Sequence, residues 1–205
     1  DGRVRRQRLE VNAGLTKALN KGLTLAQGEL IARQDADDLS APARLSSQVR
    51  YFDEHPDVGI LGTACGLIGD DGKEQAVLVL AEEEASIRWR MLFHNPFCHS
   101  SVMFRRTVLE AAGGGYDECL AFSQDFDLWS RMLRLTGGAN LPQPLIGLRQ
   151  HEASLSSQSS ERQDQIALHI AARNMTSLSE RVADDLALMQ TLRACFFRLP
   201  ANVGH

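Results

Sequence analysis

Three carboxylates stand close together at Asp35, Asp37 and Asp38, directly after a mostly apolar run at residues 29–33. Carboxylates this close repel one another unless solvent or a cation lies among them. Oxygen-only ligands suit Mg²⁺ or Mn²⁺, which typically use one or two carboxylates together with substrate phosphates. The pattern therefore indicates a divalent metal site beyond the end of a strand. The structural alternative is that Asp37 or Asp38 caps the following helix.

Asp125 is the second candidate for chemistry. It lies in the first turn of a helix predicted to begin after Ser123, and a glycine loop at Gly113–Gly115 precedes that helix. A carboxylate at the end of a cleft can act as a general base. Alternatively, Asp125 only stabilises the positive end of the helix dipole. The glycines form either a connector or a loop whose backbone approaches a ligand, and Asp127 is expected to make structural contacts.

Histidines add possible ligands and cleft residues. His151 ends an extended segment, and beside a carboxylate-bound divalent ion it is a reasonable nitrogen ligand. His94 and His99 lie on either side of Phe97, where they either line an acceptor cleft or pack in the interior.

The elements that must position these residues alternate along the chain. A helix followed by a strand that ends in carboxylates is half of an α/β unit, in which ligands lie beyond the carboxyl end of the strand. Expected strands cover Glu29–Arg33, Val58–Thr63, Ala76–Leu80, Ser101–Phe104 and the extended segment Leu141–Leu148. Expected helices cover Val11–Gln27, a segment capped by Ser40, Glu82–Leu92, Thr107–Ala112, a segment from Ser123 to a stop at Gly137–Gly138, Gln165–Leu178 and Val182–Phe197.

Composition excludes several classes of protein. The chain has 205 residues, of which 43% are hydrophobic and 23% charged, and its net charge is −4. These values are ordinary for a globular domain and give no reason to expect a nucleic-acid partner. No apolar run approaches the roughly 20 residues that span a bilayer. The four cysteines are scattered, so a cysteine-built metal site is not expected and a cytoplasmic location is.

Several motifs in a fixed order closely resemble the family 2 glycosyltransferases. The resemblance runs from about Asn12 to about Ser160, and such an ordered set is more specific than any one motif. The motifs are Asn12-x-Gly14-Leu15, Ala18-Leu19-Asn20-x-Gly22, Gly28-Glu29-Leu30-Ile31-Ala32-x-x-Asp35-Ala36-Asp37-Asp38, Pro42-x-Arg44-Leu45, His99-Ser100-Ser101-Val102-Met103-Phe104-Arg105, Gly114-Gly115-Tyr116-Asp117-Glu118, Gln124-Asp125-Phe126-Asp127-Leu128-Trp129-x-Arg131 and His151-x-x-Ser154.

The resemblance implies the α/β fold called GT-A, a Rossmann-like fold of nucleotide-diphospho-sugar transferases with a mixed sheet flanked by helices. This domain is expected over residues 1–152, followed by a linker and C-terminal helices over residues 153–205. The first strand of the family is expected to lie before Asp1. A sheet without that strand has exposed edges, which favour self-association into a homo-oligomer.

On the donor side, the resemblance implies that Asp35, Asp37, Gly114 and Gly115 bind a nucleotide-diphospho-sugar, most commonly a UDP-sugar. Mn²⁺ or Mg²⁺ is expected on Asp37 and His151. Asp35 either lies on the nucleoside side or shares the metal.

On the acceptor side, the resemblance makes Asp125 the catalytic base. Gln124 stands where a glutamate is frequent in the family, which removes one neighbouring charge but leaves the base intact. Gln124, His99 and Tyr116 are expected to line the acceptor cleft.

The expected activity is metal-dependent transfer of the sugar to an acceptor hydroxyl with inversion, in polysaccharide or other glycoconjugate synthesis. The acceptor is a glycan or a lipid-linked sugar, and docking at the inner face of a membrane fits such an acceptor. One alternative is a glycosidase, which uses paired carboxylates and needs no metal or nucleotide. Another is a non-catalytic or incomplete module that binds a nucleotide sugar or a partner.

Overall fold

The computed structural model of the chain describes residues 2–149 and 160–197. Within these residues the strands form one six-stranded sheet in the order β1-β5-β3-β6-β2, with β4 beside β3. The neighbours β3 and β6 are parallel, and the other pairs are antiparallel. This mixed sheet confirms the expected α/β class. The strands are β1 (Leu30–Ala32), β2 (Leu39–Ser40), β3 (Val58–Ile68), β4 (Glu74–Leu78), β5 (Met103–Arg105) and β6 (Gly137–Arg149).

The central strand β3 is buried along almost its whole length. Its run of apolar and small residues is typical of a strand that is covered on both faces. Alternation along the strand divides the core, since Ile60 packs into the cluster around α5 whereas Leu61 packs with Phe52 of α2. The sequence predicted an end at Thr63, but β3 continues to Ile68 because both β4 and β6 pair with its second half.

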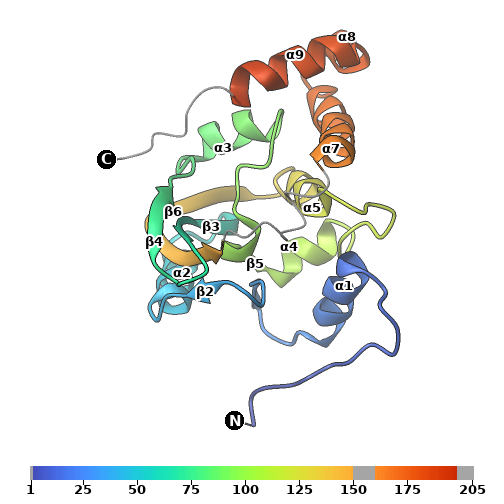
Figure 1. Ribbon diagram of the computed structural model, residues 1–205. Coiled ribbons are helices and arrows are strands. Elements are labelled where there is room, and N and C mark those ends of the chain that lie inside the picture. The colour runs from blue at the N-terminus through green and yellow to red at the C-terminus, as the bar shows by residue number, and fades with distance from the viewer. Residues whose placement is uncertain (1, 150–159, 198–205) are drawn as a thin grey trace.

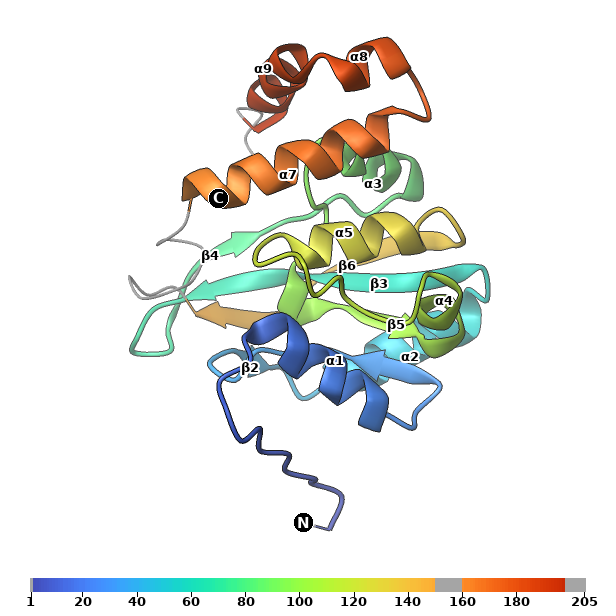
Figure 2. The ribbon, with the colours of Figure 1, turned by 90° about the vertical axis from the view of Figure 1, so that its right-hand side faces the viewer.

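Helices lie on both sides of the sheet (Figure 2). On one side are α3, α5 and α7, with α8 and α9 stacked beyond them, and α2 lies on the other (Figure 1). Leu19 and Leu23 of α1 pack against the same core cluster as α5. Among the described helices, none is both long and apolar enough to cross a bilayer. The helices are α1 (Leu15–Leu25), α2 (Arg44–Glu54), α3 (Glu84–Met91), α4 (Arg106–Ala111), α5 (Gln124–Met132), α7 (Ser160–Met175), α8 (Glu180–Asp184) and α9 (Leu186–Phe197).

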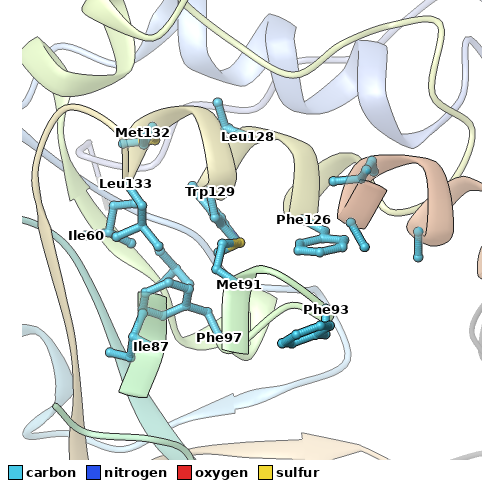
Figure 3. Packing of buried hydrophobic residues seen from close by; sticks show 14 of the residues in the cluster. Ile60, Ile87, Met91, Phe93, Phe97, Phe126, Leu128, Trp129, Met132 and Leu133 are labelled. Atoms are coloured by element: carbon cyan, nitrogen blue, oxygen red, sulfur yellow. The ribbon is translucent and has the colours of Figure 1, made fainter. Parts of the chain in front are cut away.

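The main core gathers around Trp129 of α5, which is completely buried (Figure 3). Ile87 and Met91 of α3 contribute to the same cluster, and so does Ile170 of α7. The C-terminal helix α7 therefore packs directly against the helix whose first turn carries Asp125.

Boundary predictions also failed at Ser40 and at Gly137–Gly138. Ser40 does not cap a helix, because it belongs to β2, where it pairs with Ile146 of β6, and the next helix begins only at Arg44. The strand β6 supplies this pairing edge from more than 100 residues away, so the local sequence does not reveal it. The pair Gly137–Gly138 does not stop α5 but begins β6. A side-chain Cβ at Gly138 would lie 2.6 Å from Leu133 Cδ2, so glycine lets the strand pass close beneath the end of α5.

Candidate active site

The carboxylate of Asp35, just beyond β1, is held by the guanidinium of Arg33. Arg33 Nη1 donates to Asp35 Oδ2 at 2.5 Å, and its Nη2 donates to Oδ1. Ser100 joins the pair, since its Oγ donates to Asp35 Oδ2 at 3.0 Å and accepts from Arg33 Nη1 at 2.9 Å. Bidentate arginine–carboxylate pairs are strong, and they fix the orientation of the carboxylate. Both oxygens of Asp35 are therefore committed to neighbours within the protein.

The next two carboxylates lie in different environments. Asp37 is exposed, whereas Asp38 is buried and its Oδ1 accepts the backbone N–H of Arg149 at 2.8 Å. The Nε of Arg149 in turn donates to the backbone carbonyl of Asp37 at 3.0 Å. The other carboxylate oxygen of Asp38 is buried and has no hydrogen-bond partner among the described residues. Asp38 thus anchors the loop to the end of β6, whereas Asp37 is exposed.

The carboxylates of this loop fit a divalent cation if only one or two of them bind it and other ligands complete its shell. Within residues 2–149 and 160–197, no three His, Cys, Asp or Glu side chains converge as a closed metal site. Mg²⁺ commonly needs only one or two protein carboxylates when substrate phosphates complete its shell. Asp37 is an exposed carboxylate of this loop and could supply one such ligand. The other predicted ligand, His151, lies outside the described residues.

Asp125 is fixed through both of its oxygens. Its Oδ1 accepts the N–H of Phe126 at 2.9 Å, and its Oδ2 accepts from Asn95 Nδ2 at 2.8 Å. Burial raises the pKa of Asp125, and it outweighs the opposing effects of the backbone N–H groups, the charge of Arg33 and the amide of Asn95. A carboxylate with a raised pKa is a better proton acceptor than an ordinary aspartate.

The residue before α5, Ser123, has a left-handed backbone with φ of 55°. Its side chain does not cap the helix, contrary to the prediction, and its Oγ donates to the carbonyl of Gln163 in α7 at 3.4 Å. Non-glycine residues at positive φ are strained and gather at functional sites. This strain lies two residues before Asp125.

Replacing Asn95 by Ala should move the acidic limb of the pH profile of transfer to higher pH. The Asn95 amide stabilises the ionised form of Asp125, so its loss raises the pKa of Asp125 further. A base works only when ionised, and activity therefore falls as the pH drops through that raised pKa. The measurement is kcat/KM against pH, with Gln190→Ala on the exposed side of α9 as control. If the acidic limb of the Asn95→Ala variant does not move, the Asn95 amide does not control the pKa of the base.

His99 and Tyr116 meet beside Asp125. His99 Nε2 lies 3.0 Å from Tyr116 Oη, and the His99 ring packs edge-on against Trp129. Burial lowers the pKa of His99 well below its usual value, and the charge of Arg33 lowers it further, so the ring is neutral at pH 7. Burial also raises the pKa of Tyr116, on which the charges of Arg33, Asp125 and Asp35 all act. The charges of the predicted catalytic and donor carboxylates therefore both act on one tyrosine hydroxyl.

The glycine loop begins as the end of α4. The N–H of Gly114 bonds the carbonyl of Leu109 at 2.8 Å, and that of Gly113 bonds the carbonyl of Glu110 at 3.2 Å. These are the two bonds of a Schellman motif, which needs a left-handed residue at its first position past the helix. Gly113 has φ of 105° and Gly114 has φ of 81°.

Asn20 of α1 holds the other side of this loop. Its Oδ1 accepts the N–H of Tyr116 and its Nδ2 donates to the carbonyl of Tyr116, both at 2.9 Å. A Cβ at Gly115 would lie 2.7 Å from Asn20 Oδ1. The third glycine is therefore required by the close approach of Asn20 to the loop.

Gly115→Ala should destabilise the chain by about 1–3 kcal/mol, because the new methyl group displaces the Asn20 amide from Tyr116. Urea unfolding followed by circular dichroism measures this change. The matched control is Gly22→Ala inside α1, where a Cβ meets nothing within 4 Å. That variant should be stabilised by roughly 0.5–1 kcal/mol, since alanine favours helix. Equal stability of the two variants would contradict the close approach.

The structure brings most of the predicted site residues into one region. Asp35, His99, Tyr116 and Asp125 are linked through Arg33 and the segment His94–Ser101, and Gln124 is buried in the same turn as Asp125. Gly114 and Gly115 precede Tyr116 directly. The catalytic, donor, acceptor and metal roles themselves stay predictions.

Five residues of this region received no functional role from the sequence: Asn20, Arg33, Asn95, Ser100 and Arg149. Each holds a predicted site residue or the backbone beside one. The signal that pointed toward them was their place inside or next to the motifs and the predicted site residues.

The fold has counterparts among solved structures. It resembles the crystal structure of S. aureus TarS 1–349 in complex with UDP-GlcNAc, with a TM-score of 0.66 and 18% sequence identity over 96% of this chain and 57% of the TarS 1–349 chain. At this identity the likeness establishes the fold alone, which is the expected GT-A type.

The sequence comparisons then identify the family. The model of glycosyl transferase family 2 matches residues 1–113, and the chain belongs to that family. It is 38% identical over 143 residues to the amylovoran biosynthesis glycosyltransferase AmsE of Erwinia amylovora, covering 69% of this chain and 52% of AmsE. It is 34% identical over 160 residues to the O-antigen biosynthesis glycosyltransferase WbnJ of Escherichia coli, covering 75% of this chain and 60% of WbnJ. The chain thus spans between half and two thirds of the length of these relatives.

Proposed function

We propose that this chain carries the transfer centre of an inverting glycosyltransferase that moves a sugar from a nucleotide diphosphate to an acceptor hydroxyl. The observation that carries the proposal is the placement of Asp125. Its half-buried carboxylate is oriented by Asn95 and Phe126, and its charge, like that of Asp35, acts on the hydroxyl of Tyr116. A base and a donor-side carboxylate flanking one small region suit a single displacement.

The donor is a UDP-sugar bound along Asp35, Asp37, Gly114 and Gly115. Arg33 keeps the Asp35 carboxylate in a fixed orientation toward the nucleoside. Asp37 and His151 would hold Mn²⁺ or Mg²⁺, which when bound supplies Lewis-acid stabilisation of the departing diphosphate. TarS, whose structure contains UDP-GlcNAc, supports the class of donor.

The acceptor enters beside Gln124, His99 and Tyr116. Asp125 removes the proton from the acceptor hydroxyl as that oxygen bonds to the anomeric carbon and the bond to the diphosphate breaks. Attack from the face opposite the leaving group inverts the anomeric configuration. The His99–Tyr116 pair can orient sugar hydroxyls without taking the proton, because burial lowers the pKa of His99 and makes it a weak base.

The acceptor is a glycan or lipid-linked sugar in the synthesis of a surface polysaccharide. The names of AmsE and WbnJ, which refer to amylovoran and O-antigen biosynthesis, support this class of product.

Calorimetric titration of the 205-residue chain with UDP and with UDP-glucose tests the donor site. We expect binding in the presence of Mn²⁺ and a marked loss of binding after addition of EDTA. Equal affinity with and without the metal would contradict the metal assignment. Absence of any binding by UDP or UDP-glucose would contradict the donor proposal for this chain, and binding that EDTA leaves intact would favour a metal-free site.

A further inference from the structure

Asp127, two residues after the proposed base, is a buried carboxylate shared by two arginines. Arg131, one turn later in α5, donates from Nε to Asp127 Oδ2 at 2.9 Å. Arg173 of α7 donates from Nη1 to Asp127 Oδ1 at 2.7 Å and from Nη2 to Ser130 Oγ at 2.9 Å. The Asp127 side chain is only 3% exposed. One carboxylate oxygen of Asp127 therefore has a cationic partner from α5, and the other has a cationic partner from α7.

The guanidinium of Arg131 continues from Asp127 to the glycine loop. Its Nη2 donates to the carbonyl of Gly115 at 2.7 Å, and its Nη1 donates to the carbonyl of Ala112. These two carbonyls bracket Gly113 and Gly114, both of which have positive φ angles. The backbone on either side of the two left-handed glycines is thus held by one arginine.

The carboxylate of Asp127 and the guanidinium groups of Arg131 and Arg173 depend on one another electrostatically. A buried carboxylate that loses one of its cations keeps an uncompensated oxygen and draws the remaining cation toward it. When the Arg173 guanidinium is removed, Asp127 Oδ1 loses its charged partner. The guanidinium of Arg131 is then drawn toward Asp127 and away from the two loop carbonyls. The position of α7 is in this way coupled to the backbone at Ala112 and Gly115.

We propose that α7 sets the position of the glycine loop through the chain of contacts Arg173–Asp127–Arg131, and that the two arginines are positioning residues for donor binding. The proposal rests on the proposed function for its donor side. By this proposal α7 influences donor binding through the glycine loop, although none of the proposed donor-binding residues lies in α7.

Hydrogen–deuterium exchange on the free chain tests the coupling directly. Arg173→Gln and Arg131→Lys should each raise exchange of the amides at residues 113–116 by about threefold or more. Arg173→Lys keeps the charge toward Asp127 and should restore most of the protection. The matched control is Arg88→Lys, because Arg88 pairs with Glu84 one turn before it and donates to the carbonyls of Leu133 and Thr136.

The position of the effect decides between coupling and general loosening. If Arg173→Gln leaves residues 113–116 as protected as Arg88→Lys does, the coupling from α7 is wrong. If exchange rises equally over α1 and β3 as well, Arg173 has only a general stabilising role and the proposal is also wrong.

UDP binding in the presence of Mn²⁺ tests the second half of the proposal. We expect Arg173→Gln to weaken UDP binding about threefold or more, and Arg173→Lys to restore it. Unchanged UDP affinity with a loosened loop would overturn the positioning role. If the unmodified chain does not bind UDP, the proposed donor fails, and with it the positioning role, whereas the exchange result still decides whether α7 controls the loop.

Discussion

Asp125→Asn should lower the rate of sugar transfer by about 10²–10⁴-fold, the usual contribution of a general base. Asparagine keeps the size of the side chain, and its oxygen can still accept the N–H of Phe126. It cannot take a proton from the acceptor hydroxyl at neutral pH. UDP binding should be nearly unchanged, because Asp125 lies on the acceptor side. Transfer is measured with radiolabelled UDP-sugar and binding by calorimetry.

The control for Asp125→Asn is Asp184→Asn, at an exposed position in α8. This variant makes the same chemical change and should transfer at close to the unmodified rate. If Asp125→Asn also transfers at a near-normal rate, the base is another residue. If it loses UDP binding together with transfer, Asp125 belongs to the donor site instead.

Asp37→Ala should remove most of the effect of Mn²⁺ on UDP binding, a loss of about tenfold or more in affinity. Asp37 is the exposed carboxylate of the loop, whereas Asp35 is paired with Arg33 and Asp38 anchors Arg149. The backbone of the loop should stay in place, since its bond from Arg149 goes to the Asp37 carbonyl and not to its side chain. Titration of UDP at several Mn²⁺ concentrations measures the change.

Asp71→Ala, in the exposed turn between β3 and β4, serves as the control for a lost surface carboxylate. It should bind UDP with the same dependence on Mn²⁺ as the unmodified chain. An Asp37→Ala variant that keeps this dependence would place the metal on other ligands. Circular dichroism verifies that both variants remain folded.

The sequence predicted those parts of the fold that local patterns control. The apolar run of β3, the stop of α4 at the glycines and the start of α5 near Ser123 all follow from short-range preferences. Predictions failed where a distant segment decided the local structure. Ser40 lies in a strand because β6 pairs with it, and Gly138 lies in a strand because β3 pairs with it.

The candidate site divides in the same way. Motif order pointed to Asp35, Asp125 and Tyr116, and the structure brings these residues near one another. The sequence could not reveal that Ser100 bonds Asp35 across 65 positions or that Asn95 bonds Asp125 across 30. Such contacts depend on how the sheet and α5 are packed together. The loop from Asn95 to Ser100 is short, but its partners are set by the whole fold.

That loop has a consequence for attempts to change acceptor specificity. Asn95, His99 and Ser100 contact Asp125, Tyr116 and Asp35 respectively. A graft that replaces the loop with one from a relative would disturb both the proposed base and the proposed donor-side carboxylate in the same step. Engineering for new products should therefore retain Asn95–Ser100 as a unit and diversify surrounding positions that touch only one substrate.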